Sequence, residues 1–304
     1  MADAREVYPL TGSWDYRFDG GPSEKVTVPH TWNASDAADG VKGKNGDAKS
    51  VDSGVYKRGP AVYTRTLPVA PKPGKRYFIR GEGASIVSEV SVNGKPAGRH
   101  EGAFTAFCHE ITSLLKKGSN TVSVMVDNTQ RDHHDFSMFG GLYRPIELIE
   151  TDQVCIDPLY ASRSPDNSAE VEAKTLLNLP KPRAMTVAVG AWNKQGKKVA
   201  GKTVKASAEE KKSLEVPVML AISNPVPWNA TKNPYLYQVK VSIRTEDGQT
   251  DEMVQPLGLR TVSVDPGRGF VLNGKTMQIK GVSRHQDRKG KGWALSPEDE
   301  EQSG

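Results

Sequence analysis

The sequence has little of three features that would point to particular classes of protein. It has only two cysteines, Cys108 and Cys155, whose number and spacing fit neither a disulfide framework nor a zinc site. No apolar run approaches the roughly 18 residues of a membrane-spanning helix. The net charge is only +5, and the lysines are scattered through turn-like stretches such as KPGKR and LKKG. We therefore expect no membrane span and no nucleic-acid partner, which would require a concentrated basic face.

Long helical patterns are also scarce, and short alternating patterns take their place up to about residue 150. The stretch 88–96, SEVSVNGKP, alternates valine with polar residues and then reaches Asn-Gly, which favours a tight hairpin turn. The stretch 120–128, NTVSVMVDN, places three valines on one face of a second strand. Residues 33–54 form a long polar loop of the kind that is functional or unstructured. This region predicts a jelly-roll-like β-sandwich.

The alternation continues from about residue 151 to 263 with polar turns between the strands. The stretch 235–245, YLYQVKVSIRT, puts Tyr237, Val239, Val241 and Ile243 on one face of a strand. About a hundred residues of this pattern predict an immunoglobulin-like β-sandwich.

The last region, 264–304, has a different pattern. It begins with a hairpin over Asn-Gly, and the apolar stretch 277–282, MQIKGV, then leads to a cluster of polar residues. Ser296-Pro297 is typical of a helix start, and the acidic run that follows suits the positive end of a helix dipole. A strand that ends in polar residues and precedes a helix is typical of the first step of an α/β barrel. No apolar stripe follows Ser296, so we expect this helix to have nothing to bury.

Six segments together carry a family resemblance. In their order and spacing they resemble the N-terminal part of the family 2 glycoside hydrolases, which include β-galactosidases, β-glucuronidases and β-mannosidases. The resemblance covers nearly the whole chain, with Glu110 where the family often has Asp and Ser283 where Asn is common. The segments are GSWDYRFDG with VTVPHTWN, VSVNGKPAGRHEGAFTAFCHEIT, FGGLYRPIEL, NPYLYQVKVSI, LGLRTVSVDPGRGFVLNG and KGVSRHQDRKGKGWAL.

The resemblance implies an all-β chain with three parts. These are a sugar-binding jelly-roll domain over 1–150, an immunoglobulin-like sandwich over 151–263, and the start of a truncated catalytic (β/α)8 barrel over 264–304. In this family the acid/base and the nucleophile are glutamates on later barrel strands, a pair suited to retaining hydrolysis. We therefore expect no catalytic residue in this chain and no hydrolysis by the chain alone. The acidic run after Ser296 is interpreted as a helix start.

The resemblance also indicates which residues touch sugar. It places Asp135 and His285 in the sugar subsite and Arg58 near a position that offers a polar group to the substrate. A carboxylate suits this role because it accepts two directional hydrogen bonds from vicinal hydroxyls. We expect Arg144 to be structural and to pair with an acid.

The stretch HHD, residues 133–135, could suggest a metal site. Adjacent residues of a strand point to opposite faces, whereas metal ligands must converge, so we expect no transition-metal site there. We also expect no cofactor for this chain. The resemblance allows the parent enzyme a monovalent or divalent cation.

The leading hypothesis is the non-catalytic front of a retaining β-glycosidase, a β-galactosidase, that is homo-oligomeric and takes a β-linked oligosaccharide or galactoside. One alternative is the corresponding part of a β-glucuronidase. Two others are a free-standing carbohydrate-binding or adhesion module and a structural interaction protein. The N-terminus MADAREVYPL shows no signal-peptide pattern, or it follows a removed one, so a bacterial cytoplasm and a periplasm both remain open.

Overall fold

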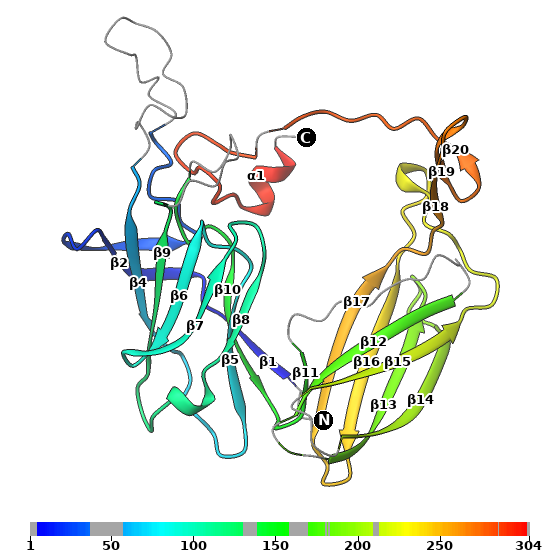
Figure 1. Cartoon of the computed structure of the whole chain (residues 1–304), viewed down its shortest axis with the longest axis horizontal. Helices are drawn as coiled ribbons and strands as arrows, with labels where there is room; N and C mark the ends of the chain where they lie inside the picture. The colour runs from blue at the N-terminus through cyan, green and yellow to red at the C-terminus, as the bar shows by residue number, and fades with distance from the viewer. Residues whose placement is uncertain are drawn as a thin grey trace, which may run out of the picture. The chain divides into compact units, whose positions relative to one another are not determined.

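The chain forms two compact units built almost entirely from antiparallel strands (Figure 1). One unit contains Glu6–Glu150 and Ser283–Gly304, and the other contains Met1–Arg5 and Thr151–Val282. The all-β prediction is confirmed. The computed structural model describes residues 5–36, 57–129, 139–157, 170–179, 181, 183–208, 213–284 and 286–302.

The first unit is a jelly-roll-like sandwich of a six-stranded and a four-stranded sheet. Valines that alternate with polar residues along β9 (Thr121–Asp127) are fully buried, as the sequence pattern predicts. The six-stranded sheet has the order β3 (Ser23–Val28), β2 (Gly12–Phe18), β4 (Pro60–Thr66), β9 (Thr121–Asp127), β6 (Val87–Val92) and β7 (Lys95–Glu101). The four-stranded sheet has the order β1 (Arg5–Pro9), β10 (Ile146–Thr151), β5 (Arg76–Gly81) and β8 (Phe107–Glu110).

The hairpin predicted at Asn93-Gly94 joins β6 to β7. Both residues have positive φ, +53° and +77°, which a two-residue turn of this kind requires and which Asn and Gly tolerate best. Fully buried Trp14, Tyr63 and Ile79 lie in the core between the two sheets. The same turn chemistry recurs in the second unit.

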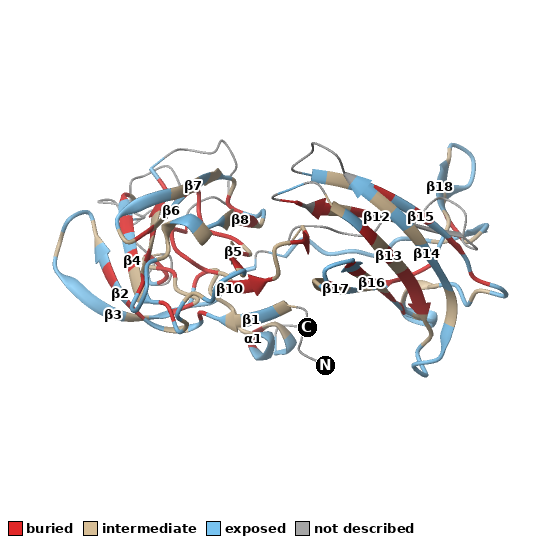
Figure 2. Cartoon of the chain, turned by 90° about the horizontal axis from the view of Figure 1, so that it is seen from below, coloured by how far each residue is buried: buried red, intermediate tan, exposed pale blue. Residues whose placement is uncertain are grey.

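The second unit is an immunoglobulin-like sandwich in which one sheet has four strands and the other three. Tyr237, Val239, Val241 and Ile243 all face its core, as predicted, and Figure 2 shows such buried residues in red along the strands. The four-stranded sheet has the order β14 (Lys198–Ala208), β13 (Arg183–Trp192), β16 (Tyr237–Thr245) and β17 (Thr250–Leu257). The three-stranded sheet has the order β11 (Cys155–Ile156), β12 (Glu170–Asn178) and β15 (Ser213–Ala221).

A small sheet of β18 (Val262–Asp265), β19 (Gly269–Leu272) and β20 (Lys275–Thr276) follows, and its last hairpin turns at the predicted Asn-Gly. The strand predicted over 277–282 does not form. Apart from a hydrogen bond from Met277 N to Phe270 O of β19 (2.9 Å), the segment has no strand pairing, and Ile279 and Val282 are 65% and 92% exposed. A strand is defined by its ladder of hydrogen bonds, and no described strand pairs with this one.

The chain ends in the short helix α1 (Pro297–Glu301), which begins at the predicted Ser296. Two single-turn 3₁₀ helices, η1 (Thr112–Leu114) and η2 (Ala230–Lys232), lie in loops. Within the described part of the chain, no helix has the length and apolar character needed to cross a membrane.

Candidate functional site

Two adjacent glycines, Gly140 and Gly141, allow three chain segments to meet at one end of the first sandwich. A Cβ on Gly140 would lie 2.0 Å from Cζ2 of Trp32, and a Cβ on Gly141 would lie 2.0 Å from the carbonyl oxygen of His30. The same segments are joined by backbone bonds from His30 N to Leu142 O (2.9 Å) and from Trp32 N to Gly140 O (3.0 Å). Any side chain at either glycine would force these segments apart.

Two buried asparagines hold the segments in place. Asn33 accepts a hydrogen bond from Gly140 N through Oδ1 (2.9 Å) and donates from Nδ2 to Lys57 O (3.2 Å). Asn128 accepts from Gly59 N through Oδ1 (3.0 Å). Each asparagine therefore ties a loop segment to a neighbouring one, which fixes the end of the sandwich by polar contacts rather than by apolar packing alone.

Arg58 lies next to Asn128 at this end of the sandwich. Its half-buried guanidinium donates a hydrogen bond from Nη1 to the backbone oxygen of Asn128 (3.1 Å). Three buried polar atoms at this end have no hydrogen-bond partner among the described residues: Nδ2 of Asn128, Oγ1 of Thr31 and Oγ of Ser85. Ser85 adjoins the glycine pair, because its N–H donates to Gly141 O (3.1 Å). The half-buried guanidinium of Arg58 gives this end N–H donors for the oxygens of a polyhydroxylated ligand, whereas the three unpartnered atoms are sealed from solvent.

An aromatic cluster of Tyr16, His30 and Tyr63 packs next to this end of the sandwich. Nδ1 of His30 lies 2.9 Å from the hydroxyl of Tyr63, and the rings of His30 and Tyr16 pack edge-to-face with centroids 5.0 Å apart. Burial lowers the pKa of His30 to about 4, because the charged imidazolium loses its hydration. His30 is therefore neutral at pH 7 and acts here as a half-buried structural group.

The C-terminal segment packs on the same end of this unit (Figure 1). The indole of Trp293 lies among three rings, with centroid distances of 5.2 Å to Phe104, 5.5 Å to Phe139 and 5.3 Å to Tyr143. Gly292 lies so close that a Cβ there would be 2.6 Å from Cγ2 of Thr31. The segment before α1 thus has apolar contacts that the sequence pattern did not predict.

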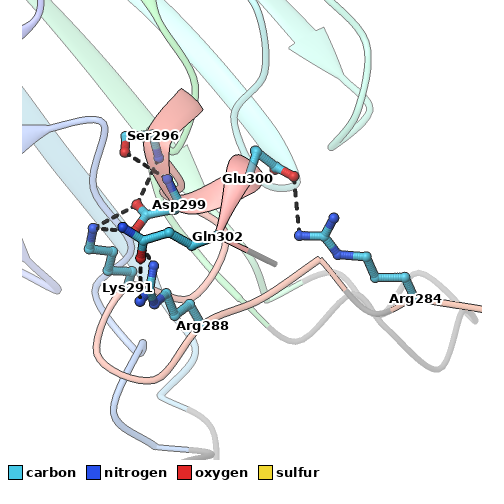
Figure 3. A network of polar contacts seen from close by, with 7 residues as sticks. All are labelled: Arg284, Arg288, Lys291, Ser296, Asp299, Glu300 and Gln302. Carbon is cyan, nitrogen blue, oxygen red and sulfur yellow. Dashed lines mark hydrogen bonds and ion pairs between the residues drawn. The ribbon is translucent and has the colours of Figure 1, made fainter. Parts of the chain in front are cut away.

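Asp299 is the centre of the polar network that shapes this segment (Figure 3). Its carboxylate accepts hydrogen bonds from Nη1 of Arg288 (2.6 Å), from Nζ of Lys291 (2.6 and 2.7 Å) and from Ser296 N (2.9 Å). Ser296 Oγ accepts from Asp299 N (3.3 Å), which completes a capping box. The hydrogen bond from Lys291 is the main cause that holds the pKa of Asp299 well below its usual range. The expectation that α1 has nothing to bury is wrong, because Asp299 is 5% exposed.

The residues on either side of His285 contact the same helix. Arg284 forms an ion pair with Glu300 (3.2 Å), and Gln286 donates a hydrogen bond to the same carboxylate.

Of the three residues predicted to touch sugar, the structure places one. Arg58 lies at the glycine-pair end, whereas Asp135 and His285 fall outside the described residues, so their roles stay predictions. The expected acid partner of Arg144 is not found among the described residues. Its Nη1 lies 3.4 Å from Phe104 O, and its guanidinium stacks on the ring of Tyr143.

The sequence reasoning missed Asn33, Asn128 and Trp293. The signal for Trp293 was a single large aromatic residue in the Gly- and Lys-rich stretch KGKGWAL. Among the described residues, no group of three or more His, Cys, Asp or Glu side chains is placed to hold a metal ion. Residues 133–135 lie outside that search.

Comparison with known proteins places this fold in a family. Residues 154–260 match the sequence model described as "Glycosyl hydrolases family 2". The chain is 37% identical over 317 aligned residues to a β-glucuronidase of Bacteroides fragilis, which covers 98% of this chain and 44% of that protein. It is 30% identical over 226 residues to a β-galactosidase of Thermoanaerobacter pseudethanolicus, which covers 70% of this chain and 30% of that protein.

Solved structures agree with this similarity. The crystal structure of a putative β-galactosidase from Bacteroides fragilis superposes with a TM-score of 0.84 at 32% identity, over 98% of this chain and 47% of that chain. The chain belongs to glycosyl hydrolase family 2. It spans less than half the length of the relatives that it matches.

Proposed function

We propose that this chain supplies the two β-sandwiches of a retaining β-glycosidase, and that the glycine-pair end of the first sandwich forms part of the sugar subsite. The observation that carries the proposal is the 37% identity to a β-glucuronidase over 98% of the chain. In this proposal the catalytic glutamates lie outside these 304 residues, so the chain positions substrate and does not cleave it.

Arg58 is the described residue best placed to touch substrate. Its guanidinium is half-buried and donates one hydrogen bond to a backbone oxygen. A guanidinium has five N–H donors, so others remain to bind hydroxyl or carboxylate oxygens. Asp135 and His285 join it as proposed subsite residues. Described residues close to them in sequence, Phe139 and Gln286, contact the C-terminal segment.

Two substrates compete, and each has an observation in its favour. The 37% identical relative is a β-glucuronidase, which favours a β-glucuronide. The protein whose structure superposes with a TM-score of 0.84 is described as a putative β-galactosidase, which favours a β-galactoside. A cationic Arg58 suits a glucuronide because the sugar carboxylate pairs with a guanidinium better than a neutral hydroxyl does.

The test is hydrolysis of nitrophenyl β-glucuronide and β-galactoside by the product of the complete reading frame that contains these residues. We expect hydrolysis of one of the two, and none by residues 1–304 alone. Arg58→Gln should raise KM severalfold, whereas the control Arg65→Gln should not. Arg65 lies on the same sandwich but donates to the backbone oxygens of Leu10 and Thr11. No hydrolysis of either glycoside by the complete protein would overturn the proposal.

A further inference from the structure

A second concave surface lies on the outer face of the immunoglobulin-like sandwich. A hollow of about 590 Å³ opens over β13, β16 and β17 and is bounded by the turn after β13 and by Pro234 and Leu236. All of its lining residues belong to the second unit. This surface is independent of the sugar subsite proposed above.

A pair of glycines lies beneath Trp192, which lines this hollow. Gly190 of β13 lies directly opposite Gly201 of β14. A Cβ on Gly190 would lie 2.5 Å from Cη2 of Trp192, and a Cβ on Gly201 would lie 2.4 Å from Cε of Lys198. The missing side chains therefore let the indole and the lysine stem lie down on the sheet instead of standing out from it. The sheet carries a half-exposed aromatic ring along one edge of the hollow.

The hollow combines apolar area with amide groups. Leu236 and Val254 remain 43% and 51% exposed on its surface. Gln238 lies directly opposite Trp192 in the register of β13 and β16, so its exposed amide adjoins the ring. A flat ring, apolar surroundings and nearby amides match the two kinds of surface on a pyranose, an apolar C–H face and a rim of hydroxyls.

The charged residues that line the hollow are lysines. Its nine lining residues include Lys194 and Lys240 and no carboxylate. Nζ of Lys198 adds a third ammonium, 5.5 Å from the centroid of the Trp192 ring. A neighbouring acid, Glu252, forms an ion pair with Lys240. Because Glu252 neutralises Lys240, Lys194 and Lys198 carry the positive charge that complements an anionic ligand.

We propose that this hollow binds an acidic oligosaccharide, in which one sugar ring stacks on Trp192 and the carboxylate of a uronic acid lies against Lys194 and Lys198. Neither the family assignment nor the proposed hydrolysis requires such a site. Binding here would hold the protein on a uronate-containing polysaccharide, away from the sugar subsite.

The test is isothermal titration of residues 1–304 with two tetrasaccharides. One alternates β-linked glucuronate with N-acetylglucosamine, and the other, chitotetraose, is neutral and of equal length. We expect the acidic sugar to bind at least several times more tightly, with an affinity that falls as salt is added. Trp192→Ala should weaken binding roughly tenfold, or about 1.4 kcal/mol.

Three further variants keep the result interpretable. Lys194→Gln leaves the fold untouched and should weaken only the acidic sugar, severalfold. Gly190→Val should displace the indole and weaken both sugars. Trp228→Ala, which removes another half-exposed Trp of the same unit outside the hollow, should leave both affinities unchanged. Equal affinity for the two sugars, full affinity in Trp192→Ala, or no binding of the acidic sugar would each overturn the proposal.

Discussion

The ring of Trp293 and the ring of Tyr143 lie 5.3 Å apart, centroid to centroid, at an interplanar angle of 59°. Tyr143 is itself fixed, because its hydroxyl donates to Ala103 O at 2.5 Å, and burial raises its pKa to about 12. The hydroxyl therefore remains a donor throughout the physiological range. The C-terminal segment thus packs against a fixed point of the first sandwich, which leads to a first prediction.

Trp293→Ala should release the segment 286–302 from the sandwich. The variant loses contacts with three rings, and replacing a well-packed aromatic residue by alanine costs about 3 kcal/mol. We expect faster amide hydrogen exchange in 286–302, with little change in β9 or β4. Trp293→Phe, which keeps an aromatic ring in place, should lose less protection. Unchanged exchange in the alanine variant would show that the packing of Trp293 does not hold the segment.

Gly140→Ala should destabilise the first unit. The new methyl group would lie 2.0 Å from Cζ2 of Trp32 and 2.6 Å from Nδ2 of Asn128, and overpacking of this kind costs about 1–3 kcal/mol. The measurement is the midpoint of urea unfolding. Gly281→Ala is the matched control, because no atom lies within 4 Å of its Cβ position. Equal midpoints for the two variants would contradict the close approach at Gly140.

The stability of the first unit should fall as the pH drops from about 6.5 to about 4. The pKa of His30 is about 4 in the folded chain and 6.5 when unperturbed, so the unfolded chain binds the proton first. The contribution of His30 is therefore fully present above pH 6.5 and is lost toward pH 4, by at most about 3 kcal/mol. Burial lowers the pKa of His109 as well, which adds a loss of the same sign.

Urea unfolding of the chain and of His30→Gln, at several pH values in this range, would isolate the share of His30. The variant should be less stable at pH 7 and should lose less stability on acidification. If the two proteins lost stability in parallel between pH 6.5 and 4, the neutral state of the half-buried His30 would be wrong.

The strands were predictable wherever local patterns were enough to define them. Alternating apolar and polar residues in the stretches 120–128 and 235–245 predict strands with one buried face. The structure contains both strands, β9 and β16. Asn93-Gly94 likewise defines a turn without help from distant residues. Ser296 with Asp299 three residues later is a third such case, since a capping box is local.

Contacts between distant segments were not predictable in this way. The ion pair of Arg284 with Glu300 depends on how the chain returns to α1, which no spacing rule encodes. Asn33 and Asn128 resemble ordinary loop residues in the sequence, and only the approach of Gly140 and Gly59 gives them partners. Residues 277–282 have the pattern of a strand, but a pattern forms a strand only when a partner edge is available.

That unpaired stretch has a practical consequence for handling the protein. Ile279 and Val282 lie exposed on an extended backbone, which is the form of chain that adds readily to the edge of another sheet. Concentrated samples should therefore self-associate through this stretch, and Val282→Lys should keep them monodisperse.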